Sequence, residues 1–261
     1  MNIHPTGFNH MSVVLVHKVG FFVLYRPTPI NFYIFELRIY ELNKTNDMKV
    51  ILVNGSPHKE GCTYTALKEV EKELINSGIE TEILWLGVKP ISGCLGCAQC
   101  LKKGPNGEPA SLRCFMKDPV NEFLDKAETA DGFIFGSPVH YAAISGALSS
   151  FMDRAFYGKG KIFRYKPAAG IVSARRGGTT AAFDQVNKYF TLSSMPVVSS
   201  KYWNMVHGTT PEDVVQDEEG MQIMRELGRN MAWLLRCIEA GRAAGIQDPV
   251  KEKPIKTNFI R

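Results

Sequence analysis

Residues 49–66 read KVILVNGSPHKEGCTYTA, and the fold can be worked out from them. Their apolar first part predicts a strand buried on both faces, and a Gly/Ser/Pro loop then leads into a helical pattern. The start of a helix has unpaired backbone N–H groups and the positive end of the helix dipole, which together favour an anion. The stretch therefore predicts a strand, an anion-binding loop and a helix.

The spacing of this loop argues against two common nucleotide sites. Gly55 and Gly61 enclose five residues, and Cys62 stands where a Walker A loop has lysine, so a nucleoside triphosphatase is not expected. Ser56 and Pro57 follow Gly55 where the dinucleotide fingerprint requires a second glycine. What remains is a Ser/Thr-rich loop for a monophosphate, with the alternative that this turn only caps a helix.

The composition is that of an ordinary globular protein. Of the 261 residues, 44% are hydrophobic, and 31 basic against 26 acidic residues give a formal charge of +5. The basic residues are spread along the chain rather than gathered in an arm, so no nucleic-acid partner is expected. The apolar run 13–25 is too short to span a bilayer, and no membrane partner is expected.

Six cysteines, four of them between positions 94 and 114, are typical of a reducing compartment, and nothing in the sequence resembles a cleavable secretory signal. We therefore expect a cytoplasmic protein.

From Met48 the sequence alternates strand and helix patterns. Strands are expected in the run from 49, at 79–86, 132–136, 168–173 and 195–199, and the last long helix at 218–244. Such alternation predicts an α/β fold, a doubly wound five-stranded parallel sheet with helices on both faces. We expect residues 1–47 to be an N-terminal extension outside the native core, 48–248 to be the domain, and 249–261 to be a C-terminal tail.

Three loops carry unusual residues, and each follows a strand. They span 55–64, 137–143 and 174–180. In a sheet of strand order 2-1-3-4-5 these loops adjoin at the carboxyl ends of the strands, where doubly wound sheets bind their ligands. The sequence therefore predicts one site built from the three loops.

Several motifs, in order, resemble the NADPH-dependent FMN reductases of the flavodoxin-like superfamily, and in particular the iron-sulfur flavoproteins among them. They are the loop 55–63, a cysteine-rich loop, Gly136–Tyr141 followed by Ser145-Gly146 and Phe151–Arg154, and the loop 173–178. The resemblance covers about residues 48–245.

The resemblance implies FMN, held without a covalent bond, with NAD(P)H as co-substrate. It implies that the flavin itself carries the chemistry, so that no catalytic side chain is needed. The family's usual loop has Arg where this chain has His58 and Asn or Ser where it has Cys62. Carried over position by position, the cofactor-binding residues are Ser56, His58, Cys62, Thr63, Tyr64, Pro138, Val139, His140, Tyr141, Ser173, Arg175, Gly177 and Gly178.

Cys94-x2-Cys97-x2-Cys100, with Cys114 after thirteen further residues, supplies four thiolates. That number suits a 4Fe–4S cluster or a zinc ion. The compact triple resembles the iron-sulfur flavoproteins, whereas the distance of the fourth cysteine departs from their tight pattern. Free or redox-active thiols are therefore the other interpretation.

Three functional classes remain open at this point. The first is an FMN-dependent NAD(P)H oxidoreductase acting on a small-molecule acceptor, such as a quinone, nitro compound, azo compound or flavin. The second is an electron-transfer module with FMN and a cluster, and the third is a cysteine-based redox sensor. The resemblance also implies a homodimer, and segment 201–217, too long for a plain connection, is expected to be a lid or a dimer arm.

Overall fold

The computed structural model describes residues 48–103, 106–107, 113–250, 252–253, 255 and 257. The predicted extension 1–47 lies outside the described residues. The described residues of the predicted tail, 249–261, belong to no helix or strand. None of the helices in the described part of the chain combines the length and apolar character that crossing a membrane requires.

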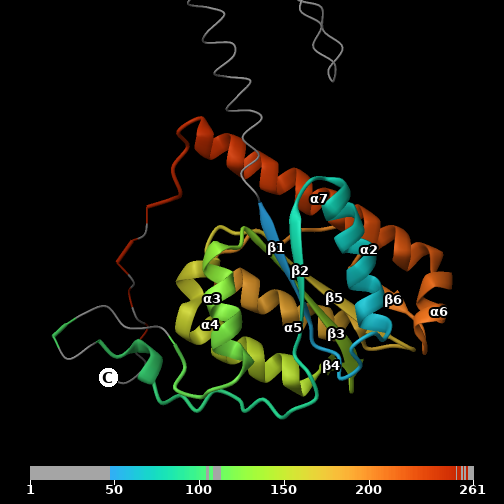
Figure 1. Ribbon diagram of the computed structural model, residues 1–261, viewed down its shortest axis with the longest axis horizontal. Helices are drawn as coiled ribbons and strands as arrows, with labels where there is room; N and C mark the ends of the chain where they lie inside the picture. Colours follow the sequence, from blue (N-terminus) through green and yellow to red (C-terminus); the bar gives the residue numbers. More distant parts are fainter. Residues whose placement is uncertain are drawn as a thin grey trace, which may run out of the picture. The chain divides into compact units, whose positions relative to one another are not determined.

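Strands and helices alternate along the chain as expected (Figure 1). The strands are β1 (Lys49–Asn54), β2 (Glu80–Trp85), β3 (Gly132–His140), β4 (Ala143–Ile144), β5 (Ala168–Ala174) and β6 (Met205–His207). The helices are α2 (Cys62–Asn76), the short 3₁₀ helix η1 (Gln99–Leu101), α3 (Pro119–Thr129), α4 (Gly146–Phe163), α5 (Thr179–Leu192), α6 (Pro211–Gln216) and α7 (Glu218–Ala243).

The main strands form a parallel sheet in the order β2-β1-β3-β5-β6, and β4 pairs antiparallel with β3. Without β4 this is the predicted order 2-1-3-4-5. The sheet therefore has six strands rather than five, and the doubly wound parallel arrangement is confirmed.

The fifth parallel strand does not lie where the sequence indicated. Residues 195–199 make only an isolated bridge between Val197 and Ala168, and the edge strand is β6. Met195 and Val198 are buried, which explains their apolar pattern. Pro196 has no N–H to donate and so limits pairing there. The segment 201–217, predicted as a lid or dimer arm, supplies β6 and α6.

The third strand is longer than predicted. It was expected to end at Gly136, but β3 continues to His140 and turns back into β4. Tyr141 and Ala142 form this turn with φ of 50° and 58°. Two successive left-handed residues are typical of a type I′ hairpin, which is usually signalled by Asn or Gly. The segment 137–143, predicted as a loop, is therefore a hairpin. The sequence did not indicate it because Tyr-Ala carries no such turn signal.

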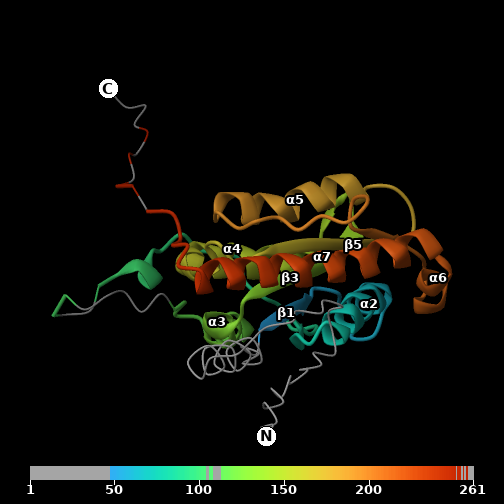
Figure 2. The same cartoon turned by 90° about the horizontal axis from the view of Figure 1, so that it is seen from above.

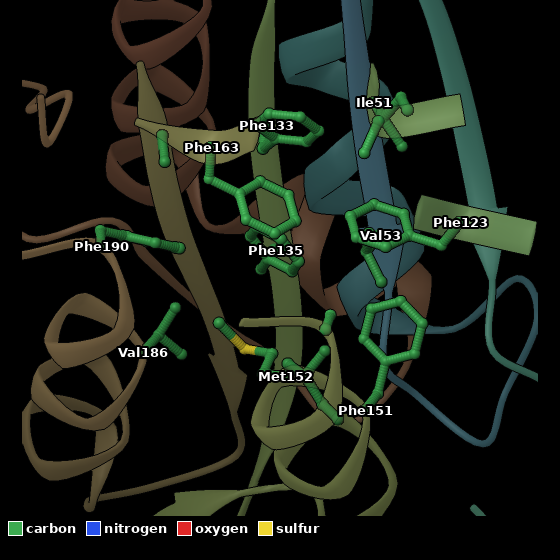
Figure 3. Close-up of a cluster of buried hydrophobic side chains, with 14 of the residues drawn as sticks. Ile51, Val53, Phe123, Phe133, Phe135, Phe151, Met152, Phe163, Val186 and Phe190 are labelled. Atoms are coloured by element: carbon green, nitrogen blue, oxygen red, sulfur yellow. The ribbon is translucent and has the colours of Figure 1, made fainter. Parts of the chain in front are cut away.

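Helices cover both faces of the sheet (Figures 1 and 2). Along β1, Val50 and Leu52 pack in the core beneath α2 and α7, whereas Ile51 and Val53 pack in the core beneath α3, α4 and α5. Figure 3 shows the second core, in which the ring centroids of Phe123 and Phe151 lie 5.0 Å apart. Burial on both faces explains the unbroken apolar run of β1.

Candidate functional site

The loops after β1, β3 and β5 meet at the carboxyl edge of the sheet. The Gly55 amide donates to the Gly136 carbonyl at 2.9 Å, joining the first loop to β3. Pro138 lies opposite Ser173 in the β3–β5 ladder. The predicted convergence of three loops is therefore present.

The first loop is folded against its own backbone. The side chain of the buried Asn54 donates from its nitrogen to the Lys59 carbonyl at 3.0 Å, and its oxygen accepts from the backbone N–H of Ser56 at 3.0 Å. The Ser56 hydroxyl accepts from the His58 amide at 3.1 Å, and the Trp85 indole donates to the Ser56 carbonyl at 2.8 Å. Asn54 and Trp85 shape the loop, yet the sequence reasoning missed both because only the tertiary contacts reveal their roles.

The start of α2 carries no side-chain cap. Its N-cap is Gly61, whose side-chain-free position makes no capping bond, whereas Asp118, Ser145 and Asp217 cap α3, α4 and α7. A Cβ at Gly61 would lie 2.9 Å from the Cβ of His58, so the turn is too tight for a larger residue. The first-turn amides of α2 are thus free to receive an anion from outside the helix.

A buried hydroxyl pair joins the first loop to β5. The Thr63 and Ser173 hydroxyls are 2.8 Å apart, and both residues are at most 3% exposed. The Thr63 methyl group lies against Gly136, where a Cβ would come within 2.9 Å of it. This pair fixes the first turn of α2 beside the end of β5.

The hairpin and the loop after β5 also touch. Gly178 has a φ of 96°, and a Cβ there would lie 2.9 Å from the Cα of Ala142 and 3.2 Å from the Val139 side chain. A side chain would be strained in that conformation and would push the hairpin away. Gly178 is also the N-cap of α5 and, like Gly61, makes no side-chain capping bond.

Two serines tie the hairpin to the first loop. The Ser137 hydroxyl accepts from the Ser145 amide at 2.9 Å, and the Ser145 hydroxyl donates to the Gly55 carbonyl at 2.7 Å. Ser145 also caps α4 by accepting from the Leu148 amide at 3.2 Å. The sequence reasoning missed this role, although a serine before a helical pattern is a recognisable cap.

The predicted cofactor residues fall into three groups at this edge. Ser56, His58, Cys62, Thr63 and Tyr64 lie on the first loop and the first turn of α2, Pro138, Val139, His140 and Tyr141 lie on the hairpin, and Ser173, Arg175, Gly177 and Gly178 lie at the end of β5 and after it. Ser56, Thr63 and Ser173 are buried, whereas His58, His140, Tyr141 and both Arg175 and Arg176 are exposed.

Cys62 is engaged within the protein. Its thiol donates to the Gly208 carbonyl at 3.8 Å. Burial raises the pKa of this thiol, and the nearby Asp213 and Glu212 carboxylates raise it further. Cys62 is therefore a neutral thiol that joins α2 to the segment after β6.

The four cysteines that were predicted to bind a metal or cluster line one pocket. Cys94, Cys97, Cys100 and Cys114 surround it together with Arg154 of α4. Burial raises the pKa of the Cys100 thiol, as do the other three cysteines. In the described part of the chain, no three Cys, His, Asp or Glu side chains are placed to hold a metal ion. The donor atoms suit a soft metal, but the loop does not present them in a ligating arrangement.

Comparison with known proteins shows which family the sequence matches. The family model of the NADPH-dependent FMN reductases matches residues 48–210. An iron-sulfur flavoprotein of Methanocaldococcus jannaschii is 32% identical over 203 residues, which are 74% of this chain and 100% of the relative. An iron-sulfur flavoprotein of Archaeoglobus fulgidus is 29% identical over 204 residues, 75% of this chain and 96% of the relative.

Solved structures share the fold at low sequence identity. RosB with its bound 8-demethyl-8-formylriboflavin-5'-phosphate intermediate has a TM-score of 0.56 at 15% identity, over 82% of this chain and 93% of that one. An NAD(P)H:quinone oxidoreductase from Methanothermobacter marburgensis has a TM-score of 0.52 at 19% identity, over 71% and 96%. The strand order and these neighbours confirm the flavodoxin-like fold.

Proposed function

The chain belongs to the NADPH-dependent FMN reductase family, and we propose that it binds FMN at the carboxyl edge of its sheet and passes electrons from NAD(P)H to a small acceptor. The observation that carries this proposal is the uncapped start of α2 beside the buried Thr63–Ser173 pair. Bound FMN supplies hydride acceptance and onward electron transfer, so the protein's task is to bind, orient and polarise.

The FMN phosphate would lie at the first turn of α2. The free amides there and the helix dipole attract a dianion without a dedicated cation. Ser56 and Thr63 provide buried hydroxyls next to these amides. His58, exposed on the same loop, adds an imidazole donor. We assign Cys62 and Tyr64 to the wall of this phosphate site.

The isoalloxazine ring would lie against the hairpin and the loop after β5, at the edge where these two segments meet. Residues 138–141 would border the ring on the hairpin side, and Ser173, Gly177 and Gly178 would border it on the side of the loop after β5. Pro138 and Ser173 are neighbours in the sheet, and Gly178 packs against Ala142, which supports this assignment. Backbone amides of the loop after β5 can stabilise negative charge that develops on the ring during reduction. Arg175 is exposed on this loop and suits either the flavin pyrimidine or a nucleotide phosphate, because a guanidinium fork can bind both.

The partners follow from the same assignment. NAD(P)H delivers hydride, and the acceptor is a small oxidised molecule such as a quinone, nitro compound, azo compound or flavin. Exposed Tyr141 at the hairpin tip would contact one of these substrates. We also propose that the protein is a homodimer, which sedimentation of the FMN-loaded protein would test. We further propose that it is located in the cytoplasm.

Anaerobic mixing of the FMN-loaded protein with NADPH, and separately with NADH, tests the reductase proposal. At least one of them should bleach the visible flavin absorption, and a quinone added afterwards should restore it. A flavin that stays oxidised with both nucleotides would exclude the reductase, and it would favour an electron-transfer protein.

A second candidate is an iron-sulfur flavoprotein, because the four cysteines line a single pocket. That pocket adjoins Arg154, which is about 12 Å along α4 from Gly146 at the flavin end of the helix, by the rise of an α-helix. A 4Fe–4S cluster there would pass electrons to or from the flavin. Iron and acid-labile sulfide should be found after anaerobic purification, and the absence of both, with no zinc, would leave free thiols.

A further inference from the structure

Arg154 is an unusual component of the cysteine pocket. Its side chain is 1% exposed, yet it comes from the middle of α4 and lines the pocket with the four cysteines. Its Nε atom is buried and makes no hydrogen bond among the described residues. A buried N–H without a partner is costly and calls for an explanation, such as an acceptor that binds there.

The guanidinium group is held in place from the side away from the unpaired Nε. Both terminal nitrogens bind the Asp118 carboxylate, Nη2 to Oδ1 at 3.0 Å and Nη1 to Oδ2. Nη1 also donates to the Ser92 carbonyl at 3.4 Å. Burial alone would lower the pKa of Arg154, but Asp118 and the Cys114 sulfur raise it, so the group stays charged.

Cys114 is equally fixed by Asn121, on α3. The Cys114 amide donates to the Asn121 side-chain oxygen at 2.9 Å, and the Asn121 side-chain nitrogen donates back to the Cys114 carbonyl at 2.8 Å. In contrast, Cys94 and Cys97 are exposed on an irregular loop. The pocket thus has one fixed side, Cys114 and Arg154, and one open side.

We propose that Arg154 is a positioning residue for a soft metal or iron-sulfur cluster at these four cysteines, and that its Nε–H donates to a ligating sulfur. The proposal rests on the second candidate function. Cys114 is the fixed ligand, and the loop 94–100 closes onto it when the metal binds. Each ligating thiol releases its proton to solvent, and the resulting thiolates gain a buried positive neighbour.

The physical reason is charge. Four thiolates around a divalent metal carry a net charge of −2, which is unfavourable where water is excluded. Asp118 compensates the charge of Arg154, but its carboxylate binds the terminal nitrogens and leaves Nε for the sulfur. Partners behind metal ligands typically change metal affinity by about 10- to 100-fold.

Co²⁺ alone is a suitable probe, because thiolate coordination gives a charge-transfer absorption. The reduced, FMN-loaded full chain is titrated anaerobically in competition with a chelator. Arg154→Gln should weaken Co²⁺ binding by about tenfold or more. Lys161→Gln, which removes an exposed positive charge from the same helix, should bind as the unmodified chain does.

A double variant separates metal binding from folding. Arg154→Gln leaves the Asp118 carboxylate without its partner, whereas Arg154→Gln with Asp118→Asn pairs two neutral amides and keeps a side chain that can cap α3. The double variant should regain thermal stability but not Co²⁺ affinity. Wild-type affinity in the double variant, or no thiolate charge transfer in the unmodified chain, would overturn the proposal. FMN content and bleaching by NADPH in the same samples report the reductase function separately.

Discussion

Thr63→Val removes one hydroxyl from the proposed phosphate site and keeps the shape of the side chain. The Thr63 hydroxyl lies 2.8 Å from that of Ser173, and either can be the donor. With FMN bound, Ser173 can donate to Thr63, which leaves the Thr63 proton for the phosphate. The variant should therefore lose about 1.5–3 kcal/mol of FMN binding, the usual value of a hydrogen bond to a charged group.

This loss corresponds to a Kd about 10 to 150 times higher, measured by the quenching of FMN fluorescence on titration into the apoprotein. Folding stability in urea should fall by only about 0.5–1.5 kcal/mol, because a neutral hydrogen bond is lost there. Thr65→Val, on the same helix with its hydroxyl bonded to the Gly61 carbonyl, is the matched control and should bind FMN normally. An FMN affinity in Thr63→Val within twofold of the unmodified chain would refute the phosphate assignment.

Two further predictions concern stability. A Cβ at Gly228 of α7 would lie 2.9 Å from the Val70 carbonyl of α2, so Gly228→Ala should lower the free energy of unfolding in urea by about 1–3 kcal/mol. Gly241→Ala on the same helix meets only ordinary contacts, and it should raise the free energy of unfolding by up to about 1 kcal/mol. Equal effects would contradict the packing argument. A hydrogen bond from Lys126 holds the pKa of the Glu82 carboxyl below its ordinary 4.5. The ionised Glu82 therefore stabilises the fold above pH 4.5, and this contribution is lost as the pH falls through the pKa that Glu82 has in the folded protein. In Lys126→Gln the free energy of unfolding in urea should fall less steeply as the pH is lowered through this range. An unchanged pH dependence would contradict a stabilising Lys126–Glu82 pair.

Local signals explain which parts of the fold the sequence predicts. Asp118 caps α3 at the start of a helical pattern, and Gly78, with a φ of 75°, follows the end of α2. Both signals act through the backbone within a few residues. The hairpin after β3 and the true edge strand were missed, because Tyr141 carries no turn signal and the apolar pattern around Pro196 reflects burial rather than pairing.

The candidate site divides in the same way. The alternation of strands and helices predicts a parallel sheet with its loops at the carboxyl edge, and the three loops converge there because the strand order is the expected one. The contacts that shape it do not, because Trp85 reaches Ser56 from β2 and Ser145 reaches Gly55 across the sheet edge. Arg154 lies in a sequence motif of the family, yet only the structure places its guanidinium beside the cysteines.

The most direct test of the central claim compares FMN with riboflavin, which lacks the phosphate, in titrations of the same apoprotein. If the phosphate lies on the free amides at the start of α2 with Thr63 beside it, FMN should bind at least about 100-fold more tightly, the sum of several hydrogen bonds to a charged group. Thr63→Val should weaken FMN and leave riboflavin unchanged. Equal affinities for FMN and riboflavin in the unmodified chain would contradict the account.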